Sequence, residues 1–255
     1  MTDLLTAVGA GVGCAALAGL AMPRLVARLS EPEPDPEPEL AEGEELTRAQ
    51  QERLAEGPKE LYAEMASSPG FGATLAGVAG VSGAVLGAAI GWDWLLLLLL
   101  PLAVVGAMLS LVDLRTRLLP AVVVRATLVA AIVYGAIAWP LTGSPDAFVR
   151  GLVGMALAWL LFAVLWFIHP RGMGYGDVRL AALTGYVLAY VDWAAYAVGM
   201  YSPFLLFGIP GALFALVKWD RKLLSAGYPF GPFLLVGVLV GVCLGGPIVD
   251  GLVNR

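Results

Sequence analysis

Apolar segments long enough to cross a membrane recur along the chain, and they constrain its fold more than any other feature. A helix needs about 20 residues to cross about 30 Å of hydrocarbon. The candidate spans are Leu4–Met22, Phe71–Gly91, Trp94–Val112, Ala121–Trp139, Phe148–Ile168, Val178–Val191, Trp193–Val217 and Gly231–Val249. The sixth span is short, and the seventh contains Pro203 and Pro210, which predict a kink or a break. With 59% apolar and 14% charged residues, the chain is predicted to be an all-α polytopic membrane protein with about eight transmembrane helices.

The arginines and lysines orient these spans. Basic residues favour the cytoplasmic side of a membrane, and with the amino terminus outside, thirteen of the fifteen lie in cytoplasmic loops or at cytoplasmic helix ends. The exceptions are Arg150 and Arg255. The opposite side collects Asp3, Asp93, Asp146, Asp192 and Asp250. The pattern predicts eight helices, with both termini outside, in an inner or plasma membrane.

An acidic segment divides the chain into three expected parts: a first transmembrane helix in residues 1–30, a cytoplasmic linker in 31–70, and a membrane core in 71–255. Glu31 to Glu64 holds twelve acids and three basic residues, a net charge of −9, so the rest of the chain carries +4 of the total of −5. Alternating prolines and like charges predict that the start of the linker is extended. Glu44 to Met65 has helical spacing and predicts a short surface helix, either solvated or docked.

Metal and cofactor chemistry finds little support in the sequence. Cys14 and Cys243 are the only cysteines and His169 is the only histidine. Neither a cysteine-based zinc site nor a multi-histidine site can be built from them. We therefore expect no metal and no organic cofactor.

Two aspartates, Asp113 and Asp177, lie at the ends of apolar spans and at the same predicted depth, on the cytoplasmic side. A carboxylate at a membrane boundary is costly to bury, which makes it a candidate functional group. Two such groups suggest an intramembrane aspartyl protease, in which they share one proton. Taken singly, Asp177 could be a helix cap, and Asp113 could pair with Arg115 or Arg117. A transporter that relays protons through both aspartates is a further alternative.

Glycines precede the second aspartate. Gly172, Gly174 and Gly176 can adopt positive backbone dihedrals and allow another chain to approach closely. Such a turn would place Asp177 at a helix start and still admit an extended substrate backbone. We interpret Gly174 and Gly176 as the supporting loop of the site.

Three motifs resemble those of the type IV prepilin peptidases, which are GxGD-type intramembrane aspartyl proteases. Asp113-Leu-Arg-Thr-Arg-Leu-Leu-Pro120 resembles their first active-site motif. Gly172-Met-Gly-Tyr-Gly-Asp177-Val-Arg-Leu180 resembles the second, and Tyr228-Pro-Phe-Gly-Pro-Phe233 resembles the segment that opens their final helix. The resemblance extends from about Phe71 onward and more loosely to the first helix.

The resemblance implies an endopeptidase that removes the basic leader of prepilins or pseudopilins on the cytoplasmic face, with Asp113 and Asp177 as its catalytic pair. It implies a prepilin substrate and the lipid bilayer as partners, and no nucleic acid. Many bacterial members carry two cysteine pairs after the first helix, associated with N-methylation, and these are replaced here by the acidic linker. An archaeal-type preflagellin peptidase and an inactive scaffold of pilus assembly remain alternatives.

Overall fold

The computed structural model describes residues 2–31, 60–143, 145–168, 173–218 and 229–253. Its helices are α1 (Thr2–Val26), α3 (Tyr62–Ser67), α4 (Phe71–Ile90), α5 (Leu96–Thr116), α6 (Ala121–Thr142), α7 (Pro145–Ile168), α8 (Tyr175–Val191), α9 (Trp193–Lys218) and α10 (Gly231–Val253). Each of the eight predicted spans has its helix, and no strand occurs among the residues described. The predicted all-α class is confirmed.

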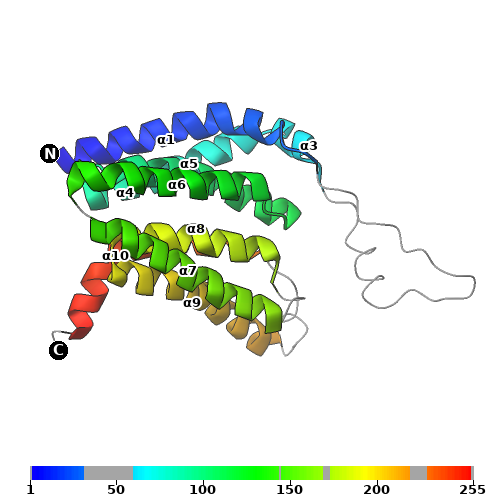
Figure 1. Ribbon diagram of the computed structural model, residues 1–255. Coiled ribbons are helices and arrows are strands. Elements are labelled where there is room, and N and C mark those ends of the chain that lie inside the picture. Colours follow the sequence, from blue (N-terminus) through cyan, green and yellow to red (C-terminus); the bar gives the residue numbers. More distant parts are fainter. Residues whose placement is uncertain (1, 32–59, 144, 169–172, 219–228, 254–255) are drawn as a thin grey trace, which may run out of the picture.

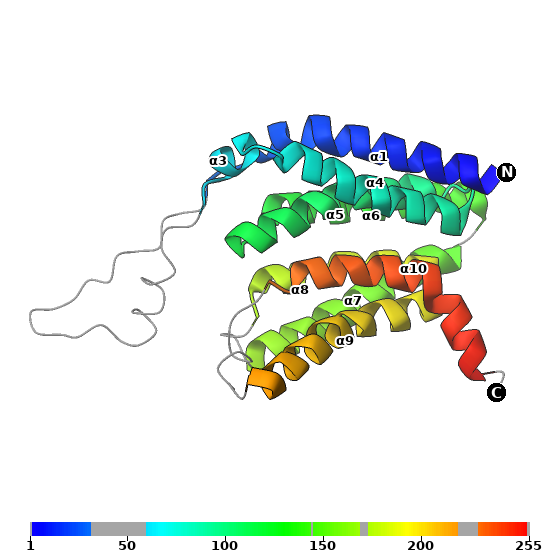
Figure 2. The same ribbon diagram turned by 180° about the vertical axis from the view of Figure 1, so that it is seen from behind.

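The helices form two layers (Figure 1). One layer holds α1, α4, α5 and α6, and the other holds α7, α8, α9 and α10; the view from behind shows the same division (Figure 2). Successive long helices run in opposite directions, so both termini lie at the same end of the bundle, away from α3 (Figure 1). This agrees with the prediction that both termini share one side.

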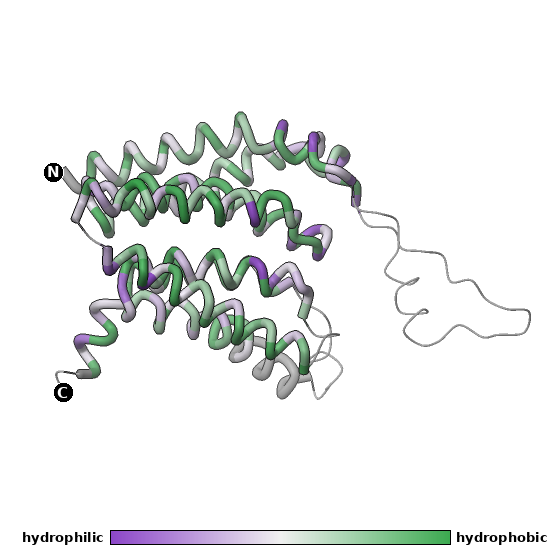
Figure 3. Tube along the Cα trace, in the orientation of Figure 1, coloured by the Kyte–Doolittle hydropathy of each residue, from purple (hydrophilic) through white to green (hydrophobic). Residues whose placement is uncertain are grey.

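Hydrophobic residues occupy most of the length of the long helices, whereas hydrophilic residues lie mainly toward the two ends of the bundle and around α3 (Figure 3). Within the described residues, six helices are long and apolar enough to cross a membrane: α1, α4, α5, α6, α7 and α10. α8 has 17 residues and is short, as its sequence predicted. The chain is therefore a multi-pass membrane protein.

Glycines bring α1 and α4 together. A Cβ added at Gly83 would lie 2.7 Å from Sγ of Cys14, and one added at Gly87 would lie 2.8 Å from the carbonyl oxygen of Thr6. Close approach through small residues is a common way for membrane helices to pack, because the backbones then make direct contact. Gly77, on the same helix, has no atom within 4 Å of its added Cβ.

The expected break in the seventh span is absent, since α9 is one continuous helix from Trp193 to Lys218. Proline removes one backbone hydrogen bond, which a helix packed among others can tolerate. The sharp bend lies in α10 instead, toward its carboxyl end (Figure 2), and this helix contains Pro247.

Only the end of the predicted linker helix over Glu44 to Met65 can be compared with the structure, because residues 32–59 lie outside the described part. There the helix is α3, which begins at Tyr62. The carboxylate of Glu31 accepts hydrogen bonds from the backbone N–H groups of Tyr62 and Ala63, at 2.7 and 2.9 Å. Burial raises the pKa of Tyr62, and the charge of Glu31 raises it further. Glu31 thus joins the start of the linker to the first turn of α3.

Candidate active site

Asp113 lies near the carboxyl end of α5, one turn inside the helix rather than at its last residue as predicted. Its side chain is only 4% exposed. The helix ends at Thr116, and the next residue, Arg117, adopts a left-handed conformation with φ of 54°. Thr116 reinforces this end, because its hydroxyl donates a hydrogen bond to the carbonyl oxygen of Val112 at 2.8 Å.

Asp177 is the third residue of α8 and is 8% exposed, so the second carboxylate is buried as well. It lies beside Gly174, whose backbone forms a hydrogen bond with it. The start of α8 is held by aromatic contacts: the ring of Tyr175 packs edge-on against Trp166 at 5.2 Å, and Arg179 lies over the ring of Tyr175 at 4.7 Å. These contacts fix the position from which Asp177 projects.

The two predicted carboxylates come from different layers, Asp113 from α5 and Asp177 from α8. Leu119, in the loop after α5, packs between the start of α8 and the start of α10. Its side chain would lie 3.0 Å from a Cβ added at Gly176 and 3.5 Å from a Cβ added at Gly231. The carboxyl end of α5, which carries Asp113, and the amino end of α8, which carries Asp177, lie at the same end of the bundle (Figure 1).

Gly231 is a site residue that the sequence did not identify. Its backbone N–H donates a buried hydrogen bond to Oδ2 of Asp113 at 3.1 Å, across 118 residues of sequence. A Cβ at this position would lie 2.7 Å from the same oxygen. In the sequence, the segment Tyr228 to Phe233 signals this role only through its family resemblance and its aromatic and glycine residues.

Phe230 anchors this segment. Its ring contacts Phe162 of α7 at 6.0 Å and Phe204 and Phe207 of α9 at 5.4 and 5.7 Å. Such aromatic contacts bury large apolar surfaces and restrict ring orientation. They place the next residue, Gly231, where its N–H can reach Asp113.

The expected role of the glycine turn needs correction. Gly174 has φ of −71° and ψ of 146°, an extended conformation open to any residue, and Gly176 is helical. Positive φ angles among the described glycines occur at Gly70, Gly91 and Gly143. Gly176 is needed for close approach, as predicted, but the approaching group is the side chain of Leu119. Gly172 lies outside the described residues.

The structure treats differently the two simpler roles considered for these aspartates, an ion pair for Asp113 and a helix cap for Asp177. Arg115 contacts Glu60 at 3.4 Å, Ser68 at 2.9 Å and the ring of Phe71 at 5.5 Å, rather than Asp113. The suggested Arg115–Asp113 pair is therefore wrong. Asp177 does lie in the first helical turn, beside the backbone of Gly174, so a capping contact accompanies whatever chemistry it performs.

The site offers two buried carboxylates and a backbone donor, which suit general acid and base chemistry on a water molecule. Among the residues described, no group of three or more histidine, cysteine or acidic side chains is arranged to hold a metal ion.

Fold and site together define a multi-pass helical membrane protein with a buried aspartate pair contributed by two helices. A model of the type IV leader peptidase family matches residues 102–245, more than half of the chain and all of the site. The chain belongs to the type IV leader peptidase family.

Curated relatives share the name prepilin leader peptidase/N-methyltransferase. The chain is 28% identical over 137 residues to the one from Escherichia coli K12, covering 52% of this chain and 57% of that protein. It is 30% identical over 155 residues to the one from Pseudomonas putida, covering 60% of this chain and 51% of that protein. The chain thus matches about half the length of these relatives. No solved structure matches it.

Proposed function

We propose that this chain is an aspartyl endopeptidase that removes the basic leader of a type IV prepilin or a related pseudopilin. The observation that carries the proposal is the pair of buried carboxylates, Asp113 and Asp177, presented by α5 and α8 at one end of the bundle. Family membership and the names of the relatives support the choice of substrate. The distribution of basic residues supports a site on the cytoplasmic face of the membrane.

The chemistry follows from the proximity of two acids. Neighbouring buried carboxyl groups cannot both ionise cheaply, so the pair holds one proton. The ionised group takes a proton from water, which attacks the scissile carbonyl, while the protonated group donates a hydrogen bond to the carbonyl oxygen. The proton then passes to the leaving amine, and the pair returns to its starting state. The N–H of Gly231 holds one oxygen of Asp113 throughout.

A transporter is less well supported. Acids that relay protons across a membrane are expected near its midplane, often beside broken helices. Here Asp113 lies one turn from the end of α5, and Asp177 lies in the first turn of α8.

N-methylation is a separate matter. The relatives' names include it, but the two cysteines of this chain cannot supply the paired cysteines that the resemblance associates with that activity. We propose peptidase activity without methyl transfer.

The test is co-expression of the full chain with a prepilin from the same genome. We expect the wild type to shorten the prepilin on gels and to leave an unmethylated new amino terminus by mass spectrometry. Asp113→Asn and Asp177→Asn should each lower leader removal at least about 100-fold, since each removes one acid–base partner. Asp146→Asn, at an exposed acid on the opposite end, is the matched control.

Full cleavage by either active-site variant would contradict the aspartyl mechanism. Cleavage of an archaeal preflagellin but of no prepilin would favour the preflagellin alternative. No cleavage of any of these substrates would favour the transporter or the inactive scaffold.

A further inference from the structure

The last turn of α5 is held from two sides. Asp113 and Arg115 are two residues apart on this helix, so their side chains leave it about 200° apart around its axis. On one side, the backbone N–H of Gly231 at the start of α10 donates to the carboxylate of Asp113 at 3.1 Å. On the other side, Arg115 contacts residues that lie just before and just after α3. Both sets of contacts bear on the position of Asp113.

Arg115 has three partners around α3. Its Nη1 donates to the hydroxyl of Ser68 at 2.9 Å and pairs with Glu60 at 3.4 Å, and its guanidinium lies 5.5 Å from the centre of the Phe71 ring. Exposed ion pairs contribute little by themselves, and the side chains of this pair are 37% and 36% exposed. The Phe71 ring, however, is buried, and the hydroxyl of Ser68 also donates to the carbonyl oxygen of Met65 at 2.7 Å. Arg115 therefore contacts a buried ring and a hydrogen-bonded hydroxyl as well as the exposed carboxylate.

α3 is itself attached to the bundle. Tyr62 and Met65 are buried and belong to the hydrophobic core. The carboxylate of Glu31, at the start of the linker, accepts two hydrogen bonds from backbone N–H groups in the first turn of α3. The contacts thus form a continuous path from Glu31 through α3 and Arg115 to the turn of α5 that carries Asp113.

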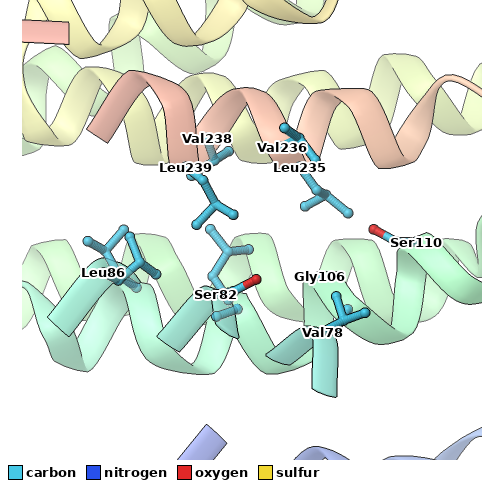
Figure 4. Close-up of a pocket in the computed structure, with 13 residues that line it drawn as sticks. Val78, Ser82, Leu86, Gly106, Ser110, Leu235, Val236, Val238 and Leu239 are labelled. Carbon is cyan, nitrogen blue, oxygen red and sulfur yellow. The ribbon is translucent and has the colours of Figure 1, made fainter. Parts of the chain in front are cut away.

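Packing along α5 is incomplete just before this turn. A cavity of about 70 Å³ lies between α4, α5 and α10. Ser110 of α5, three residues before Asp113, lines it, with Leu235 of α10 on its other side (Figure 4). Side chains that border a void lose part of their van der Waals contacts. The anchors at the end of α5 therefore matter more for the position of Asp113 than they would beside a filled core.

We propose that Arg115 is a positioning residue for Asp113, and that it couples the docking of α3 and Glu31 to the rate of leader removal. The inference rests on the proposed function. Arg115 acts by holding the last turn of α5, not by touching the substrate. Because small displacements of reacting groups are costly, loss of the guanidinium should lower kcat and leave KM nearly unchanged.

The first test is steady-state cleavage of a purified prepilin by full-length variants. Arg115→Met should lower kcat about tenfold. Arg150→Met is the matched control for lost stability, because Arg150 bonds to the end of α8 far from Asp177; it should keep nearly wild-type kcat while folded. Equal kcat for the two variants, or a change confined to KM, would overturn the positioning role.

A double-mutant cycle tests the coupling. Glu31→Ala removes the acceptor for the first turn of α3 and should lower kcat about threefold in the otherwise wild-type chain. In an Arg115→Met background it should have no further effect, because the path to α5 is already broken. Independent effects that multiply, or no effect of Glu31→Ala in either background, would overturn the coupling.

Hydrogen exchange, read by mass spectrometry without substrate, separates failure of this inference from failure of the proposed function. Arg115→Met and Glu31→Ala should each speed exchange of the amides of residues 112–116 at least about fivefold, since local opening sets that rate. Exchange at the end of α8 should not change. Unaltered exchange at residues 112–116 would overturn the inference even where the prepilin is cleaved. Faster exchange in a chain that cleaves no prepilin would support the coupling and count against the proposed function alone.

Discussion

At the scale of single residues, Gly231 combines two requirements that no other residue type can meet. Its N–H must reach Asp113, and the space beside its Cα is already filled by the same carboxylate. A backbone donor to a carboxylate favours the ionised form. Gly231 is therefore a positioning residue for the proposed reaction.

We expect Gly231→Ala to lower kcat for leader removal about 10- to 100-fold, because the added Cβ would displace Oδ2 of Asp113 and small displacements of reacting groups are costly. KM should change little. The measurement is steady-state cleavage of a purified prepilin, with thermal unfolding in detergent as a check on folding. Gly246→Ala on the same helix, where nothing lies within 4 Å, should behave like the wild type. Wild-type kcat in Gly231→Ala would contradict the positioning role.

At the scale of helices, Arg150 explains one of the two exceptions to the charge pattern. It lies on α7, and its Nη2 donates to the carbonyl oxygens of Tyr190 and Val191, each at 2.8 Å, while its Nε donates to Ala189. The last carbonyls of a helix lack partners within it, and a positive charge there is favourable. Arg150 thus caps α8 from the neighbouring helix.

Arg150→Met should destabilise the protein by about 2 kcal/mol, because hydrogen bonds to charged groups are among the stronger ones. We expect a lower melting temperature in detergent and near-normal leader removal at a temperature where the variant stays folded, since Arg150 lies at the far end of α8 from Asp177. Arg125→Met is the control, because Arg125 is exposed and its Nε donates to the carbonyl oxygen of Ala121 in its own helix. Equal melting temperatures for the two variants would contradict the capping role.

At the scale of the whole molecule, the two layers meet at the site, since Asp113 belongs to one and Asp177 to the other. The bundle end that carries the site also carries Arg28 and Arg115, and the opposite end carries Asp93 and Asp146. This polarity is the physical basis for the proposed orientation in the membrane.

Cysteine labelling tests that orientation. In a chain with Cys14 and Cys243 replaced by alanine, Asp146→Cys should react with a membrane-impermeant maleimide in intact cells. Arg28→Cys, equally exposed, should react only after the membrane is opened. The reverse result would place the aspartate pair on the outer face and contradict the proposed site of leader removal.

Helix number, helix bounds within a few residues and the placement of Asp113 and Asp177 toward one end of the bundle could be predicted, because span length and charge alternation leave few arrangements. The hydrogen bond from Gly231 to Asp113 could not be predicted, because every residue except proline has a backbone N–H and the sequence does not show which one donates. The sequence also left open whether the prolines of α9 kink or break it, and the break does not occur, because tertiary packing decides whether a proline breaks a helix. The position of Leu119 beside the site could not be predicted either, because the chain contains many similar apolar residues.

The hydrogen bonds from Tyr62 and Ala63 to Glu31 have a consequence for how such a protein can change. They hold Glu31, at the start of the acidic linker, next to the first turn of α3, whatever the residues between them are. Once the ends of a loop are closed, doubling its length costs only about 0.6 kcal/mol. This junction is therefore an insertion point where segments of different length and chemistry can be exchanged, while the end of α5 and its aspartate stay in place.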